Sequence, residues 1–246
     1  TKECLEVANS LYKNIVSETV KVSSMETAES TKLMENIFRA VNIAMVNELK
    51  LILERMNINI WEVIDAASSK PFGFKPFYPG PGMGGHCIPI DPFYLSWKAK
   101  EYNTEAKFIE LAGEINRKMT ENVSHRVGKA LNDHSKSIRN SNILILGLAY
   151  KKDIDDMRES PALKIIELLK FKGANISYHD PYIKNATKIK YVDLNKENLA
   201  KADAVLITTD HSNVDYEMVG KYAKLVIDTR NVMAGVKNPM AHILRA

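Results

Sequence analysis

Cysteine is scarce in this chain, whose 246 residues contain only Cys4 and Cys87. The two residues lie far apart and form no CxxC pair. This spacing excludes a disulfide framework and argues against a zinc site. Free cysteines in such small number favour a reducing compartment.

Long apolar runs and blocks of like charge are also missing. No stretch of about 18 apolar residues occurs, so we expect no transmembrane helix. The net charge of +4 is spread along the chain without a Lys/Arg-rich arm, which disfavours nucleic acid as a partner and suits anionic small molecules. There is no signal-peptide pattern, and the first residue is Thr1 rather than Met, which suggests a fragment.

The glycine pattern of a dinucleotide site is absent as well. The first buried strand that we expect, 142–147, leads into GLAYKKDIDDMRES, which has one glycine where GxGxxG needs three. Lys151, Lys152 and Arg158 instead place positive charge near the strand end, where it suits phosphate oxygens. Three aspartates in the same stretch partly neutralise that charge, so a solvated loop is an equally good interpretation.

The most unusual stretch present is FYPGPGMGGHCIPIDP at residues 77–92. Prolines fix the local backbone, whereas glycines let it approach a ligand closely. We therefore expect a stiff loop that cradles a diphosphate or a sugar and presents Cys87 as a nucleophile. A tight turn with an ordinary buried cysteine explains the same composition. Asp91 followed by Pro92 predicts the N-cap and first residue of a helix.

Helical periodicity dominates the first half of the chain. Apolar spacing predicts helices over 3–17, about 30 residues from Glu26, 58–67, from Pro92 through 102, and from about 105 to 131, with a lone strand at 19–22. The second of these helices is long enough to need partners on several sides, and a subunit interface is a natural one. On it, Lys32 and Asn36 lie one turn apart on one face. They form either a solvated polar stripe or an ammonium and an amide beside a reacting oxygen.

After the polar run 132–140 the predicted elements are no longer helices alone. Apolar strands at 142–147, 175–178, 204–208 and 225–228 alternate with helices, which predicts a parallel doubly wound sheet. The fold class is therefore α/β, with an all-helical region before the sheet. Ligands of such sheets bind beyond the carboxyl ends of the strands.

Four motifs, in family order over most of the chain, resemble the UDP-glucose/GDP-mannose dehydrogenase family: ESTKLMENIFRA, GPGMGGHCIPIDP, GLAYKKDIDDMRES and VIDTRNV. The flanking text KPFGFKPFYPGPGMGGHCIPIDPFYLSWKAKEYN is most similar to the bacterial UDP-N-acetylglucosamine 6-dehydrogenases. UDP-N-acetylmannosamine and UDP-glucose dehydrogenases share the core motifs. The resemblance implies an NAD-linked, two-step oxidation of a UDP-sugar at C6 in the cytoplasm, in the synthesis of surface polysaccharides such as capsule or O-antigen.

The resemblance also implies a domain plan. Residues 1–25 correspond to the remnant of an NAD-binding domain, 26–135 to a helical domain that forms a homodimer through its long helix, and 136–246 to a Rossmann-like UDP-sugar-binding domain. Without the rest of the NAD-binding domain, the isolated chain is expected not to turn over substrate. Some relatives carry an arginine that reaches the neighbouring subunit from the loop at 70–75, where this chain has only Lys70 and Lys75.

Residue roles follow from the same resemblance. Cys87 attacks the aldehyde to give a thiohemiacetal, which is oxidised to a thioester and hydrolysed. Lys32 and Asn36 hold the C6 oxygen and water, while Asp91 assists proton transfer. Arg158 reaches the NAD. The implied substrate-binding residues are Phe77, Tyr78, Pro79, Gly80, Met83, Gly84, Tyr150, Lys151 and Arg230. A non-catalytic UDP-sugar-binding or dimerisation module, in which Cys87 is a packed thiol, is the alternative.

Overall fold

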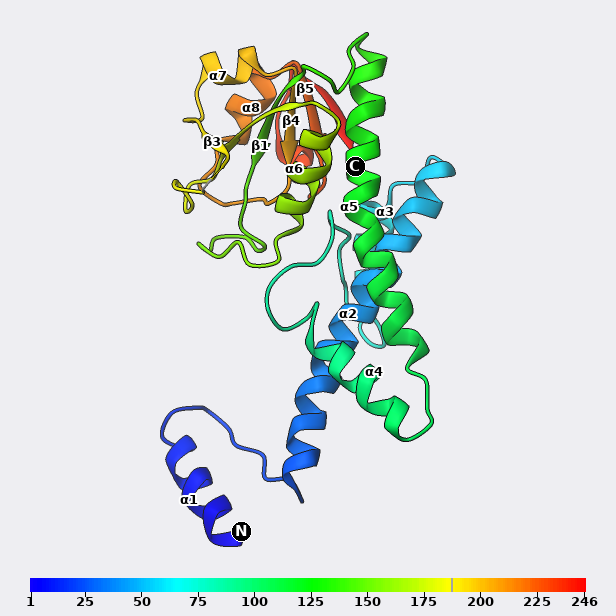
Figure 1. The fold of residues 1–246 in the computed structure, drawn as a ribbon, viewed down its shortest axis with the longest axis vertical. Helices are drawn as coiled ribbons and strands as arrows, with labels where there is room; N and C mark the ends of the chain where they lie inside the picture. The colour runs from blue at the N-terminus through cyan, green and yellow to red at the C-terminus, as the bar shows by residue number, and fades with distance from the viewer. Residues whose placement is uncertain (187) are drawn as a thin grey trace.

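A computed structural model describes residues 1–186 and 188–246. Figure 1 shows a helical part built on two long helices, with an α/β sheet at one end and the first helix at the other. The helices of the first part are α1 (Lys2–Tyr12), α2 (Met25–Arg55), α3 (Ile60–Ser68), α4 (Asp91–Glu101) and α5 (Lys107–Asp133). All five helical segments predicted from apolar spacing are therefore present.

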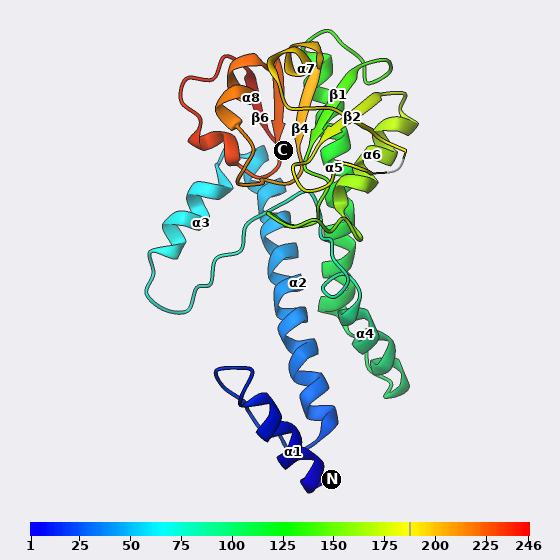
Figure 2. The ribbon, with the colours of Figure 1, turned by 90° about the vertical axis from the view of Figure 1, so that its left-hand side faces the viewer.

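Helix α2 is the longest element and has 31 residues, as its periodicity predicted. Its start is fixed by Ser24, whose hydroxyl accepts a hydrogen bond of 3.1 Å from the N–H of Thr27. Figure 2 shows α2 and α5 lying side by side, and the two helices are in contact along much of their length. Together they form the rod that carries the loop between α3 and α4.

Two local predictions are wrong. The segment 19–22 forms no strand, because none of the described residues pairs with it, and a single extended segment leaves its N–H and C=O groups unpaired. Asp91 is the first residue of α4 rather than its N-cap, which is Ile90 without a capping side chain. The carboxylate of Asp91 instead accepts a hydrogen bond from α2.

The sheet contains six parallel strands in the order β3-β2-β1-β4-β5-β6. Its elements are β1 (Asn142–Leu146), α6 (Pro161–Phe171), β2 (Asn175–His179), β3 (Lys190–Tyr191), α7 (Lys196–Lys201), β4 (Ala204–Ile207), α8 (Tyr216–Tyr222), β5 (Leu225–Asp228), the 3-10 helix η1 (Val232–Gly235) and β6 (His242–Arg245). The four predicted strands are confirmed. The two edge strands were not predicted, because β3 has only two residues and β6 is only partly buried, so neither forms a continuous apolar run.

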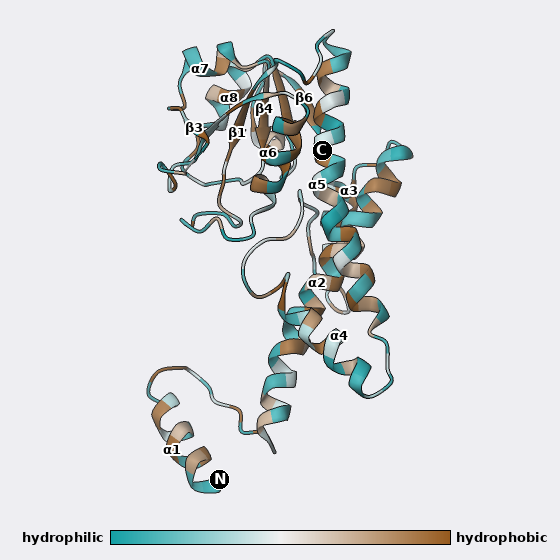
Figure 3. Cartoon of the chain, in the orientation of Figure 1, coloured by the Kyte–Doolittle hydropathy of each residue, from teal (hydrophilic) through white to brown (hydrophobic). Residues whose placement is uncertain are grey.

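Helices cover both faces of the sheet, which explains why its central strands are continuously apolar. Ile143 and Ile145 pack with α6 and with the second half of α5 on one face. Leu144 and Leu146 point to the other face, where α7 and α8 cover them. The inner strands are correspondingly brown in Figure 3. Helix α5 thus belongs both to the rod and to the core of the sheet.

Among the described residues, no helix is both long enough and apolar enough to cross a membrane. Helix α1 has no buried residue, and the exposed fraction of its apolar side chains is as high as 71% at Val7. This helix therefore contributes nothing to the core of either part.

Candidate active site

The loop between α3 and α4 is anchored to the rod by two buried asparagines. Asn47 of α2 accepts a hydrogen bond of 3.0 Å from the N–H of Gly80 and donates one of 2.9 Å to Asn116 of α5. Asn116 in turn donates to the carbonyl of Ala40 at 3.3 Å. Because buried amides need partners, this chain of bonds fixes the loop on the line where α2 and α5 meet. The sequence analysis missed both asparagines, since nothing local distinguishes them from other polar helix residues.

The structure brings three of the predicted catalytic residues together at the end of this loop. The carbonyl of half-buried Cys87 accepts hydrogen bonds from the N–H of Ile90 at 3.1 Å and of Asp91 at 2.7 Å, which starts α4. The buried amide of Asn36 donates to the carboxylate of Asp91 at 2.9 Å. Cys87, Asp91 and Asn36 therefore form one connected unit.

Lys32 lies one turn before Asn36 on α2, but its side chain is exposed. Its ammonium pairs with Glu35 on the same helix at 3.0 Å. Both side chains of this pair are more than half exposed, so the pair contributes little stability. The catalytic role of Lys32 stays a prediction.

The glycines before Cys87 allow the loop to touch the sheet domain. A Cβ atom on Gly84 would lie 2.6 Å from the Cβ of Tyr150 and 2.7 Å from the carbonyl oxygen of Glu159. The N–H of Gly85 donates to the carbonyl of Arg158 at 3.0 Å, and Gly85 has a positive φ of 89°. Tyr150 and Arg158 thus lie against the segment that ends in Cys87.

We expect the substitution Gly84→Ala to separate this loop from the sheet domain. The backbone oxygen of Glu159 cannot move away as a flexible side chain does, so the overpacking should cost about 1–3 kcal/mol of unfolding free energy. Gly235→Ala is the matched control, because its Cβ would meet no atom within 4 Å. Urea unfolding of both variants measures the effect. Equal stability of the two variants would contradict the close contact.

A second contact between loop and sheet domain is made by Arg230, which follows β5. Its Nη1 atom lies 2.7 Å from the position of a Cβ on Gly80. Its Nε donates to the carboxylate of Asp210 at 2.9 Å, and its N–H to Asp228 at 2.8 Å. The guanidinium is therefore held at the carboxyl end of the sheet with its far side turned to the loop.

The remaining predicted substrate residues occupy different environments. Phe77 packs edge-on against Phe38 of α2, and Tyr78 stacks on Trp61 of α3 at 5.4 Å between ring centroids. The Tyr78 hydroxyl donates to Asp65 at 2.9 Å, a bond that raises its pKa. Pro79 is buried beside Gly80. The first half of the loop thus contacts the helical part, and its second half contacts the sheet domain.

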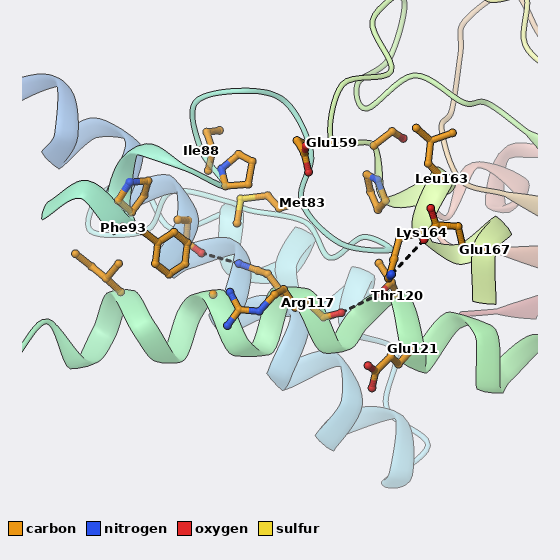
Figure 4. Close-up of a pocket in the computed structure, with 18 residues that line it drawn as sticks. Met83, Ile88, Phe93, Arg117, Thr120, Glu121, Glu159, Leu163, Lys164 and Glu167 are labelled. Atoms are coloured by element: carbon orange, nitrogen blue, oxygen red, sulfur yellow. Dashed lines mark hydrogen bonds and ion pairs between the residues drawn. The ribbon is translucent and has the colours of Figure 1, made fainter. Parts of the chain in front are cut away.

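A cavity of about 590 Å³ lies on one flank of the loop, between α5 and α6. Figure 4 shows Met83 and Ile88 on its loop side and Arg117, Thr120 and Lys164 on its helix sides. Cys87 does not line it. Of the predicted site residues, only Met83 does.

The loop after β1 carries three basic and three acidic side chains between residues 151 and 158. Asp156 is paired with Arg158 through both carboxylate oxygens, and these hydrogen bonds lower its pKa to about 2. Lys151 and Lys152 are exposed and have no ion-pair partner within the described part of the chain. The ammonium groups of Lys151 and Lys152 are thus accessible to an anion, but the loop as a whole has no net positive charge, so the phosphate interpretation stays a prediction.

Comparisons with known proteins match both parts of the chain. The model of the UDP-glucose/GDP-mannose dehydrogenase family, central domain, matches residues 26–118, and that of the same family's UDP binding domain matches residues 144–235. The chain belongs to this dehydrogenase family.

Several members of this dehydrogenase family resemble the chain over most of its length. A UDP-N-acetyl-D-mannosamine dehydrogenase of Pyrococcus horikoshii is 35% identical over 100% of the chain and 57% of its own length. An NDP-N-acetyl-D-galactosaminuronic acid dehydrogenase of Ralstonia nicotianae is 36% identical over 94% of the chain and 54% of its own. The solved structure of the UDP-D-ManNAc dehydrogenase from P. horikoshii has a TM-score of 0.85 at 34% identity, covering 98% of the chain and 57% of that structure. The chain spans about half the length of the curated relatives it matches.

Members of this dehydrogenase family use NAD, but the sheet of this chain does not fit a dinucleotide. In an NAD-binding sheet, the N–H groups after the first strand receive the pyrophosphate. Here the N–H groups of Leu148 and Ala149 donate to the buried carboxylate of Asp180 at 2.7 and 3.2 Å. A second anion has no place there. Arg158, the predicted contact to NAD, lies outside this position on the exposed loop.

Proposed function

We propose that this chain is the substrate-binding and thiol-bearing part of an NAD-dependent nucleotide-sugar 6-dehydrogenase. The observation that carries the proposal is the loop 77–87, which places Cys87 beside the Asn36–Asp91 pair while touching Tyr150 and Arg230 of the UDP-binding domain. This segment thus connects the thiol of Cys87 with the guanidinium of Arg230, a positive group that suits a diphosphate.

The chemistry assigned to these residues is the oxidation of the sugar C6 alcohol to a carboxylate. Cys87 Sγ bonds to the carbonyl carbon of the C6 aldehyde, and the carbonyl oxygen takes up a proton to give a thiohemiacetal. After oxidation to a thioester, water breaks the C–S bond and releases the acid and the thiol. NAD supplies the hydride acceptor of both oxidations. In this proposal Asn36 holds the attacking water, and Asp91, its hydrogen-bond partner, accepts the proton.

The sugar that we propose is a UDP-N-acetylhexosamine, and N-acetylmannosamine is its favoured form. The relatives compared above are named for N-acetylmannosamine and N-acetylgalactosaminuronic acid. These names support N-acetylmannosamine over the N-acetylglucosamine that we expected from the sequence around the Cys87 loop. Product analysis of the complete protein against UDP-N-acetylmannosamine, UDP-N-acetylglucosamine and UDP-glucose decides between these sugars.

We propose the same domain plan and a homodimer. Residues 1–25 belong to an NAD-binding domain, 26–135 to the helical domain and 136–246 to the UDP-sugar domain. Helix α2 exposes an apolar stripe that a second copy would cover. The stripe consists of Met34, Phe38, Met45, Leu49 and Ile52. Sedimentation of the chain as a monomer at micromolar concentration would refute the dimer.

Thiol labelling tests whether Cys87 faces a UDP-sugar site. Cys4 is exposed, so the experiment uses a Cys4→Ser background in which Cys87 is the single thiol. We expect a maleimide to label Cys87 within minutes and UDP-N-acetylmannosamine to slow this labelling roughly tenfold or more, because the sugar covers a half-buried thiol.

The control ligand for this experiment is ADP-glucose, which carries the same diphosphate on a different base and should protect far less. Labelling that a UDP-sugar leaves unchanged, although calorimetry shows the sugar bound, would favour the non-catalytic binding module. No binding of any UDP-sugar to the complete protein would remove the proposed function itself.

A further inference from the structure

The segment that joins β1 to α6 carries two of the proposed substrate residues yet has little regular structure. Residues 147–159 include Tyr150 and Lys151 and contain neither helix nor strand. A segment of this kind samples many conformations unless specific contacts hold it, and ordering it on ligand binding costs affinity. Besides backbone bonds such as that from the N–H of Tyr150 to the carbonyl of Asp156 at 3.0 Å, side-chain contacts from Asp180, His211 and Asp153 hold it.

Asp180 holds the first turn of the segment. It lies directly after β2 and has no exposed surface. Besides the N–H groups of Leu148 and Ala149, its carboxylate accepts hydrogen bonds from the N–H groups of Tyr182 at 2.8 Å and Ile183 at 3.0 Å. Burial by itself raises the pKa of this carboxyl, but the bonds from His211 and the backbone lower it to about 2, so it is ionised.

His211 links this carboxylate to the other end of the segment. Its ring is fully buried after β4, and Nε2 lies 3.1 Å from the carboxylate of Asp180. Its Nδ1 accepts a hydrogen bond of 3.0 Å from the N–H of Asp153. Since Nδ1 accepts, the proton sits on Nε2, which donates to Asp180. The ring is therefore a neutral imidazole in one tautomer, and both its nitrogens are used.

Asp153 closes the arrangement from the segment itself. It has a positive φ of 59°, and its carboxylate accepts hydrogen bonds of 2.7 Å from both the N–H and the hydroxyl of Ser212. The hydroxyl of Thr209 adds a bond of 2.6 Å to the carbonyl of Ala149. The four-residue stretch 149–152, with Tyr150 and Lys151 in it, is thus held at both ends by the residues that follow β2 and β4.

We propose that Asp180, His211 and Asp153 form a positioning network that sets the Tyr150–Lys151 stretch in the shape that receives the nucleotide sugar. This proposal rests on the proposed function, because it assigns the network to the same UDP site. The three residues do not touch the substrate. They act by removing the conformational cost of ordering the stretch, so their loss weakens binding and leaves the chemical step unchanged.

The variants Asp153→Ala, Asp153→Asn and His211→Leu test the network by calorimetry with UDP. Asp153→Ala should raise the Kd roughly tenfold. Asp153→Asn should restore most of the affinity, because its amide oxygen still accepts a hydrogen bond and asparagine tolerates a positive φ. In the complete protein, Asp153→Ala should raise KM with kcat unchanged. His211→Leu should raise the Kd for UDP at least as much as Asp153→Ala does. If the His211→Leu protein fails to fold, the comparison of Asp153→Ala with Asp153→Asn still tests the network.

Asn195→Ala is the matched stability control. It also removes a side-chain oxygen that accepts a hydrogen bond from a backbone N–H, here that of Asn198 at the start of α7 and away from the segment. Hydrogen exchange at residues 148–153 should rise in the Asp153→Ala protein and stay unchanged in the control. Wild-type UDP affinity and KM in a folded Asp153→Ala protein would overturn the positioning network. If wild type binds no UDP at all, the proposed function fails, while hydrogen exchange still reports whether the network holds the segment.

Discussion

Replacing Cys87 with serine is expected to stop uronate release while leaving UDP-sugar binding nearly intact. Release should fall by roughly three orders of magnitude or more, because a hydroxyl lacks the ionisation and the leaving-group ability on which the thioester route depends. Binding should survive because the backbone carbonyl of Cys87, not its sulfur, accepts the bonds from Ile90 and Asp91. The loop therefore keeps its shape when Sγ becomes Oγ.

The measurement is the yield of UDP-uronate from the complete protein, with Kd for the UDP-sugar determined in parallel. Cys4→Ser is the matched control, since Cys4 lies exposed on α1 and has no part in the site. Its uronate yield should equal that of wild type. Unchanged uronate production by the Cys87→Ser protein would remove this residue from the mechanism.

The elements that the sequence predicted correctly are those specified by neighbouring residues. The apolar run before Gly147 forms β1, and the periodic segment from Glu26 forms α2. Asp91 shows the limit of this reasoning. Its position before a proline is typical of a cap, but the amide of Asn36, 55 residues earlier, takes its carboxylate. A local preference yields when a buried polar group needs a tertiary partner.

The site residues also fall into two groups, those predictable from their sequence neighbours and those that depend on distant partners. Cys87 and Asp91 are neighbours in sequence, so composition alone pointed to the loop that carries them. Asn47 and His211 were missed because each acts on residues at least 30 positions away. A usable signal existed for His211, since it comes directly after one of the strand ends where ligands of parallel sheets bind. No comparable signal marks an asparagine inside a long helix.

The second large expected effect is a change in stability rather than in turnover, and it comes from replacing Lys50. It lies on α2 with 5% of its surface exposed, and its Nζ has no hydrogen-bond partner among the described residues. The nearest carboxylate, Glu54 at 3.9 Å, already pairs with Arg126. Burial lowers the pKa of Lys50 to about 8, Glu54 opposes this shift, and Arg126 adds to it. The ionised lysine therefore destabilises the folded state.

We expect Lys50→Met to raise the free energy of unfolding at pH 7 by about 3 kcal/mol, since lowering a pKa from 10.5 to about 8 corresponds to roughly that much free energy. Lys118→Met on α5, which removes an exposed lysine paired with Glu114, is the control and should change stability by less than about 0.5 kcal/mol. Urea unfolding of the 246-residue chain measures both.

The pH dependence separates this cause from improved packing. The folded pKa of about 8 lies below the unfolded value of 10.5, so the unfolded state binds more protons between these two values. Wild-type stability should then rise from about pH 8 to 10.5, and the advantage of Lys50→Met should shrink over the same interval. An advantage independent of pH would mean that methionine stabilises by packing alone. A loss of stability would mean that the attraction of Glu54 outweighs the burial of the charge.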